Sequence, residues 1–156
     1  MKAASIQELK AELQETSPAI LRQLCLQLAK FKKENKELLS YLLFQSNSES
    51  TYIQQVQQLI ADEFLELPKP NIYLTKKSLR KILRIANKHI KYMGSKQGEA
   101  QVMLYFCQQL KNSGIAYQKY PVLNNLYLQQ LKKLKKSIEG MHEDEQYDFI
   151  KAMELL

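Results

Sequence analysis

The sequence predicts an all-α protein of about eight antiparallel helices, arranged as a helical bundle or as a short α-α superhelix. Leu, Lys, Gln and Glu, which all favour helices, dominate the 156 residues. Only four glycines and four prolines interrupt them. Apolar residues recur at helical spacing along almost the whole chain, and the connections between these segments are short, which favours antiparallel helical pairs.

The first two helices have recognisable starts. Ser5 and Glu8 have the spacing of a capping box, which predicts a helix that runs to about Glu15. A second helix follows over residues 17–31, with Ser17 as the cap and a proline at the first helical position, where the missing N–H costs nothing.

The third and fourth helices differ in their apolar pattern. Residues 33–45 ("KENKELLSYLLFQ") become apolar nearly all round, so we expect a central helix that is covered on more than one side. Residues 46–50 ("SNSES") mark a break. The fourth helix is amphipathic, and its apolar stripe consists of Ile53, Val56, Ile60 and Phe64.

A proline-containing linker separates the fourth helix from the fifth. Two prolines with one residue between them, within residues 67–74, cannot continue a helix. The length of the chain fits one domain, so we expect residues 1–156 to form a single all-helical domain. Residues 67–74 are the alternative place for a division into two parts.

Four more helices complete the pattern. Thr75 is the expected cap of the fifth helix, and Gly94 ends it in the position that a left-handed cap prefers. Ser95 then caps a sixth helix, which ends around residues 112–114. The seventh covers residues 120–140 and the eighth residues 143–156, with acidic residues in its first turn, where the helix dipole favours them.

The positive charge is concentrated in the middle of the chain. The net charge is +7, but residues 67–137 hold 15 Lys and Arg against a single acid, Glu99. Residues 1–66 and 138–156 both have a net negative charge. Such a local excess is more informative than the total, because local fields attract partners of opposite charge.

The fifth helix has two opposite stripes. Its apolar stripe consists of Leu79, Ile82, Leu83, Ala86, Ile90 and Met93. Its basic stripe consists of Lys77, Lys81, Arg84, Lys88 and Lys91, with Lys76 and Arg80 beside it. Like charges at these spacings repel each other, and no acid within the helix relieves the repulsion. Folding alone gives no reason for this arrangement, which the seventh helix repeats with Lys132, Lys133, Lys135 and Lys136.

The basic face has three possible interpretations. It is either a polyanion site or a solvated face that acids elsewhere neutralise, such as those of the C-terminal helix. An anionic membrane surface is a third alternative. The candidate polyanion-binding residues are Lys77, Arg80, Lys81, Arg84, Lys88, Lys91, Lys132, Lys133 and Lys136, and Tyr73, Tyr92 and Asn87 are candidates for stacking or hydrogen bonds.

The sequence lacks the motifs of common enzymes. It has no glycine-rich phosphate loop, no nucleophile elbow and no HExxH, so we expect no catalysis and no cofactor. His89 is expected at the boundary of the core. The acids around His142 do not converge on one face of a helix, so we interpret them as favourable charges at a helix start, and we expect no metal site.

The two cysteines suggest a protein of a reducing compartment. Cys25 and Cys107 lie in apolar segments without metal spacing, so we expect buried thiols and a cytoplasmic location. The N-terminus has no apolar signal segment, and the longest apolar run is too short to span a membrane. We expect Tyr41, Tyr105 and Tyr127 in the core, and Tyr117 and Tyr120 in exposed contacts.

The segments "RQLCLQLAKFKKENKELLSYLLF" and "SLRKILRIANKHIKYMGSKQGEAQVMLYFCQQL" resemble small, uncharacterised bacterial all-helical domain families, with a HEAT-like pairing of helices. The resemblance implies a compact helical domain of unknown function and assigns no functional residues.

Together these observations predict a non-enzymatic helical binding or interaction module with a basic face, whose partner is a protein or a polyanion. The alternatives are a nucleic-acid-binding protein and a helical-repeat enzyme that acts on nucleic acid. The enzyme requires a pocket with an aromatic wall and a carboxylate near the basic stripe, and Glu99 is the one acid in that part of the sequence.

Overall fold

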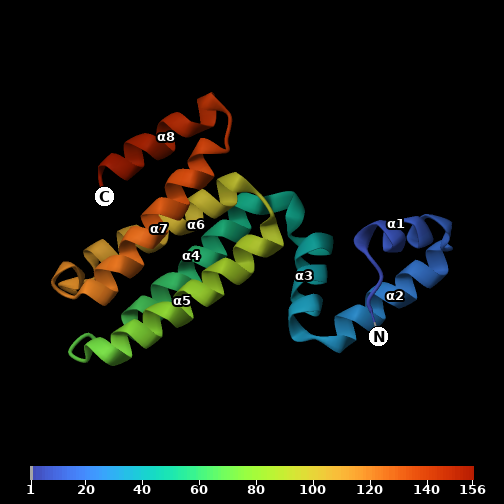
Figure 1. Cartoon of the computed structure of the whole chain (residues 1–156), viewed down its shortest axis with the longest axis horizontal. Helices are drawn as coiled ribbons and strands as arrows, with labels where there is room; N and C mark the ends of the chain where they lie inside the picture. Colours follow the sequence, from blue (N-terminus) through green and yellow to red (C-terminus); the bar gives the residue numbers. More distant parts are fainter. Residues whose placement is uncertain (1) are drawn as a thin grey trace. The chain divides into compact units, whose positions relative to one another are not determined.

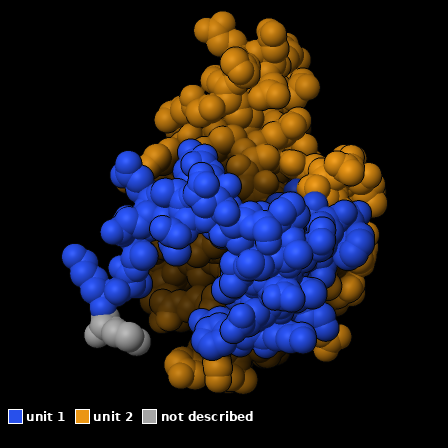
Figure 2. All heavy atoms as spheres, turned by 90° about the vertical axis from the view of Figure 1, so that its right-hand side faces the viewer, with its two compact units in different colours: residues 1–44 blue, residues 45–156 orange. Residues whose placement is uncertain are grey.

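The computed structural model describes residues 2–156, and within that range it contains eight α-helices and no strand (Figure 1). This confirms the predicted all-α class. The chain consists of two compact units, residues 1–44 and residues 45–156, which Figure 2 distinguishes by colour.

The first unit contains helices α1 (Ile6–Glu15), α2 (Pro18–Phe31) and α3 (Lys33–Phe44). The predicted capping box is present: the backbone N–H of Glu8 donates to Ser5 Oγ at 3.3 Å, and the N–H of Ser5 donates to Glu8 Oε2 at 2.7 Å. Helix α2 packs against α3.

The prediction that α3 is a central, covered helix is wrong. Of its last four residues only Tyr41 is buried, whereas Leu42, Leu43 and Phe44 are 53%, 61% and 81% exposed. A unit of this length has too few helices to cover an apolar helix on several sides. Cys25, expected as a buried thiol, is exposed in the same unit.

The second unit contains the four long helices α4 to α7, which run up and down, and the shorter helix α8 at its end (Figure 1). Helices α4 and α6 pack on each other, α5 contacts both, α7 packs on α6, and α8 packs on α6 and α7. Two single-turn 3-10 helices, η1 and η2, complete the unit. In chain order the elements are η1 (Ser46–Ser48), α4 (Glu49–Leu65), α5 (Ile72–Met93), α6 (Lys96–Asn112), η2 (Tyr117–Lys119), α7 (Pro121–Glu139) and α8 (Glu143–Glu154).

The hydrophobic core of this unit is formed by the inner faces of its long helices. The apolar stripe predicted for α4 is buried, and the ring of Phe64 meets that of Phe106 on α6 edge to face, with centroids 5.5 Å apart. The side chains with the least exposure in the unit include Val56, Ile60, Leu79, Ile82, Val102, Met103, Phe106, Cys107, Leu110, Leu123 and Leu134.

Helix α5 begins earlier than the sequence predicts. Its cap is Asn71, whose side chain accepts a hydrogen bond from the backbone N–H of Leu74 at 3.1 Å. Thr75, the predicted cap, is fully buried inside the helix, and its hydroxyl donates to the carbonyl of Pro68 at 2.9 Å. The helix therefore starts directly after the second proline, and its first turn includes Tyr73.

The other end of α5 follows the prediction. Gly94 has a φ of 65°, the left-handed conformation that glycine adopts readily. Ser95 Oγ then accepts from the N–H of Gly98 at 2.9 Å and donates to the carboxylate of Glu49 on α4. This cap consequently joins the starts of α4 and α6.

The proline-containing linker lies inside the second unit. It connects α4 with α5, which pack on each other, and Leu67 in the linker is buried. The two compact units divide between Phe44 and Gln45 and not at residues 67–74. Two prolines with one residue between them can thus end a helix without separating the helices on either side of them.

Candidate functional site

Helix α5 has an apolar side and a charged side, as the sequence predicts. Leu79, Ile82 and Ala86 are fully buried, and Leu83 is nearly so. On the opposite side the exposed cations are Lys77, Arg80, Lys81, Arg84 and Lys91, while Lys76 and Lys88 are half-buried. The helix bears seven basic residues and no acid.

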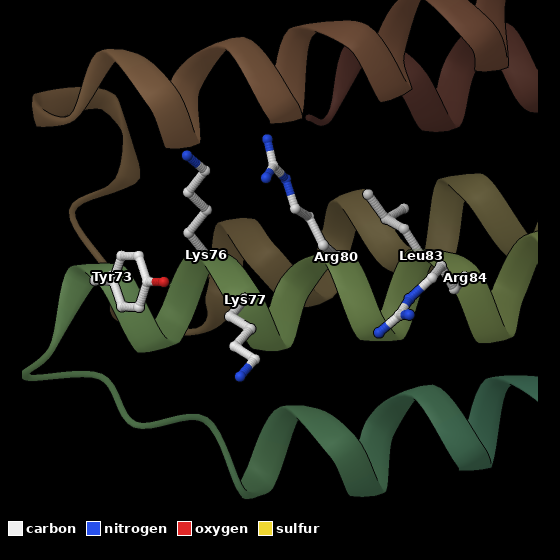
Figure 3. Close-up of a pocket in the computed structure, with 6 residues that line it drawn as sticks. All are labelled: Tyr73, Lys76, Lys77, Arg80, Leu83 and Arg84. Atoms are coloured by element: carbon white, nitrogen blue, oxygen red, sulfur yellow. The ribbon is translucent and has the colours of Figure 1, made fainter.

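A surface cavity of about 550 Å³ lies on the N-terminal half of this charged side (Figure 3). In Figure 3 the side chains of Lys76 and Arg80 point from α5 toward the ribbon of α7, whereas the side chain of Lys77 points away from α7, toward the ribbon of α4. The cavity is lined by Tyr73, Lys76, Lys77, Arg80, Leu83 and Arg84. Four of these six residues are cations, so the cavity is suited to an anion.

One acid partly neutralises this face. Lys81 Nζ lies 2.7 Å and 2.8 Å from the two carboxylate oxygens of Glu63 on α4. Within residues 2–156, no acidic side chain lies within 4.0 Å of the charged groups of Lys77, Arg80 and Arg84. The acidic helix α8 packs on α6 and α7 and forms no ion pair with these three cations. Most of the charge around the cavity is therefore uncompensated.

Of the three polar residues that the sequence associates with this face, only Tyr73 is available to a ligand. The residue is 74% exposed and lies at the end of the cavity (Figure 3). Tyr92 is buried, and the Asn87 side-chain amide donates to the carbonyl of Leu83 at 2.7 Å. The sequence pattern cannot distinguish these three residues, because their exposure depends on the neighbouring helices.

The basic residues of α7 are exposed but do not line the cavity on α5. Lys132, Lys133 and Lys136 all face solvent. Lys135 lines a separate groove between α7 and α8, together with Ile138 and Ile150. The candidate residues thus divide into an α5 group around a cavity and an α7 group outside it.

The two histidines lie in different surroundings, far apart in the sequence. The Tyr52 hydroxyl and His89 Nδ1 are hydrogen bonded at 2.6 Å, and His89 is half-buried, as expected for a residue at the edge of the core. His142 is the N-terminal cap residue of α8 and is exposed. In the described part of the chain, no three His, Cys, Asp or Glu side chains come together in a geometry that could hold a metal ion.

A buried cluster of nucleophilic side chains lies between α6 and α7. Burial raises the pKa of the Cys107 thiol to about 12, and burial also raises the pKa of the neighbouring Tyr127 hydroxyl. Tyr117, expected in an exposed contact, is buried with its ring centroid 4.8 Å from that of Tyr127, because η2 folds back onto α7. Tyr120 is exposed as expected, and Tyr105 is half-buried. The raised pKa values keep the Cys107 thiol and the Tyr127 hydroxyl protonated at neutral pH, and both residues are buried.

Comparisons with known proteins do not assign the chain to a family. No protein family, no curated protein and no solved structure matches the chain. The resemblance to uncharacterised bacterial families stays a prediction. None of the helices in residues 2–156 combines the length and apolar character that crossing a membrane requires.

Proposed function

We propose that this chain is a non-enzymatic helical binding module that binds the phosphate groups of nucleic acid on the charged side of α5. One observation carries the proposal: a cavity of about 550 Å³ is bordered by Lys77, Arg80 and Arg84, which have no acidic partner within the described residues. Burying the charges of an anion against such cations releases counterions, which favours association.

The structure favours this function over a solvated face. A helix whose cations served only solubility would gain from acids three or four residues away, because each such pair stabilises a helix by about 0.2–0.5 kcal/mol. Helix α5 has none. Glu63, which does reach the stripe from α4, pairs with Lys81, and Lys81 does not line the cavity.

The same geometry disfavours a membrane surface as the partner. A helix that lies on a membrane inserts its apolar side into the lipid. The apolar side of α5 is already used in the core, where Leu79, Ile82 and Ala86 are fully buried. Only the charged side remains for a ligand.

An enzyme that acts on nucleic acid receives less support. Such an enzyme needs a carboxylate or another acid–base group beside the bound phosphates. None of the residues that line the cavity is acidic. Glu99 accepts from the Ser137 hydroxyl at 3.1 Å and pairs with Lys96 at 3.3 Å, so it has a structural role at the start of α6.

The test is binding of short DNA and RNA oligonucleotides across a salt series, measured by fluorescence anisotropy. Contact with about three phosphates predicts a slope of log K against log salt of about −2 for a single strand and about −3 for a duplex. Affinity for a single strand should therefore fall about 15-fold between 50 and 200 mM salt. Each of the changes Lys77→Gln, Arg80→Gln and Arg84→Gln should reduce the slope by about 0.7.

A matched control distinguishes binding at this face from a general attraction of nucleic acid to positive charge. Lys30→Gln removes an exposed lysine from α2 and should leave the slope unchanged. The triple change Lys132→Gln, Lys133→Gln and Lys136→Gln tests whether α7 takes part. No binding at low salt, or equal losses from the α5 variants and the control, would remove the proposal, as would binding to anionic vesicles without binding to oligonucleotides.

A further inference from the structure

We infer that the charged side of α5 binds single-stranded nucleic acid in preference to a duplex, with one base stacked on Tyr73 and the adjoining phosphates on Lys77, Arg80 and Arg84. This inference rests on the proposed function and adds the class of nucleic acid to it. Its starting point is an aromatic side chain that lies in line with the cations.

Tyr73 lies in the first turn of α5 and is 74% exposed. In Figure 3 its ring is at one end of the cavity, and none of the other five labelled side chains crosses it. Because Tyr73 is exposed and lines the cavity, the flat face of its ring is accessible beside Lys76 and Lys77. Tyr92, at the other end of the helix, is buried.

The register of the helix places this ring on the basic stripe. At 3.6 residues per turn, Tyr73, Lys77, Arg80 and Arg84 all fall within an arc of about 60°. The rise from Tyr73 to Arg84 is about 16 Å at 1.5 Å per residue. That length matches about five stacked nucleotides of one strand, at about 3.4 Å each. One base and several phosphates can therefore be bound at the same time.

The chemistry of the face distinguishes a single strand from a duplex. Stacking needs a base whose flat side is accessible, and in a duplex these sides are covered by the neighbouring base pairs. Proteins that bind single strands without reading the sequence combine cations along the backbone with aromatic rings under the bases. A duplex can use only the cations here, so Tyr73 should contribute to single-strand binding alone.

The experiment compares three probes of about 12 nucleotides: oligothymidylate, an abasic deoxyribose-phosphate oligomer and a blunt DNA duplex. Each is titrated with the full chain, with Tyr73→Ala and with Tyr73→Phe. Tyr147→Ala, which removes a tyrosine that is also largely exposed but lies on α8, is the matched control. Because Tyr73 is exposed, all variants should fold, and circular dichroism verifies this.

The full chain should bind oligothymidylate more tightly than the duplex or the abasic oligomer. Tyr73→Ala should weaken oligothymidylate binding by about 5- to 150-fold, the range for one stacked base, and leave the other two probes unchanged. Tyr73→Phe should retain most of the affinity, because it keeps the ring, and Tyr147→Ala should have no effect.

Two results would overturn the inference, and they are distinguishable. If Tyr73→Ala leaves oligothymidylate binding unchanged while Lys77→Gln and Arg84→Gln weaken it, stacking is wrong and the proposed function survives. If the full chain binds the duplex and oligothymidylate with equal affinity, the preference for a single strand is likewise wrong and the proposed function survives. If no probe binds at low salt, both the proposed function and the inference are wrong.

Discussion

Arg80→Gln should stabilise the protein, although most substitutions destabilise the proteins in which they are made. Arg80 is exposed on α5, and its helical neighbours three and four residues away include Lys76, Lys77 and Arg84. No acidic side chain within residues 2–156 pairs with it. Gln and Arg have similar helix propensities, so the change mainly removes charge repulsion.

The size of the effect follows from these three like-charge pairs. Each pair costs about 0.2–0.5 kcal/mol at low salt, so removing three should raise the free energy of unfolding by about 0.6–1.5 kcal/mol. For a chain of this length, 1 kcal/mol shifts the melting temperature by about 2–4 °C. The expected gain is consequently about 1–6 °C.

Thermal unfolding followed by circular dichroism, at low salt and at about 1 M salt, measures this gain. It should disappear at the higher salt, where the Debye length falls to about 3 Å. Lys81→Gln is the internal control, because it loses the 2.7 Å pair with Glu63 while it relieves repulsion from Lys77 and Arg84. Its net effect should be close to zero. A lower melting temperature for Arg80→Gln at low salt, or a gain that salt does not change, would show that the stripe is not under electrostatic strain.

Three further predictions concern the two cysteines and a closely packed glycine. Cys25 should react with a thiol reagent in the folded protein, whereas Cys107, whose pKa burial raises to about 12, should react only on unfolding; equal rates would contradict the assigned burial. Because this folded-state pKa lies above the usual value of 9.0, the stability that Cys107 contributes should decline from about pH 9 toward about pH 12, and Cys107→Ala should reduce that decline in alkaline denaturant titrations. Gly98→Ala should cost about 1–3 kcal/mol in urea unfolding, because its Cβ would lie 2.8 Å from the Ser95 hydroxyl oxygen; Gly140→Ala, whose nearest contact is 3.5 Å, should be tolerated.

Local chemistry sufficed to predict the helices and the two sides of α5. A capping box such as that of Ser5 and Glu8, or a left-handed glycine such as Gly94, is defined within a few residues of sequence. The apolar and basic stripes of α5 follow from the period of the helix alone. These features need no knowledge of what packs against them, which is why the prediction and the structure agree there.

Features that depend on distant residues could not be predicted in the same way. The pattern of α3 shows that Leu42, Leu43 and Phe44 are apolar, but it does not show whether other helices are available to cover them. The choice between Asn71 and Thr75 as a cap depends on how the linker folds against α5. The pair of Lys81 with Glu63 joins residues on two different helices, so the sequence did not reveal that part of the basic stripe is neutralised.

Glu63 therefore offers a direct way to change the charge of the proposed binding face without altering α5. Glu63→Gln should release Lys81 as an additional cation, so affinity for oligothymidylate should rise at low salt and the salt slope should steepen by about 0.7. The same change should lower stability by about 0.2–1 kcal/mol, because it removes a partly exposed ion pair. Arg80→Gln should thus weaken binding and raise stability, whereas Glu63→Gln should strengthen binding and lower stability. The reason is that the cations of α5 attract the ligand but repel one another in the folded protein. If Glu63→Gln leaves the salt slope unchanged while Arg80→Gln reduces it, Lys81 lies outside the bound phosphates, and the ligand occupies only the side of α5 that borders the cavity.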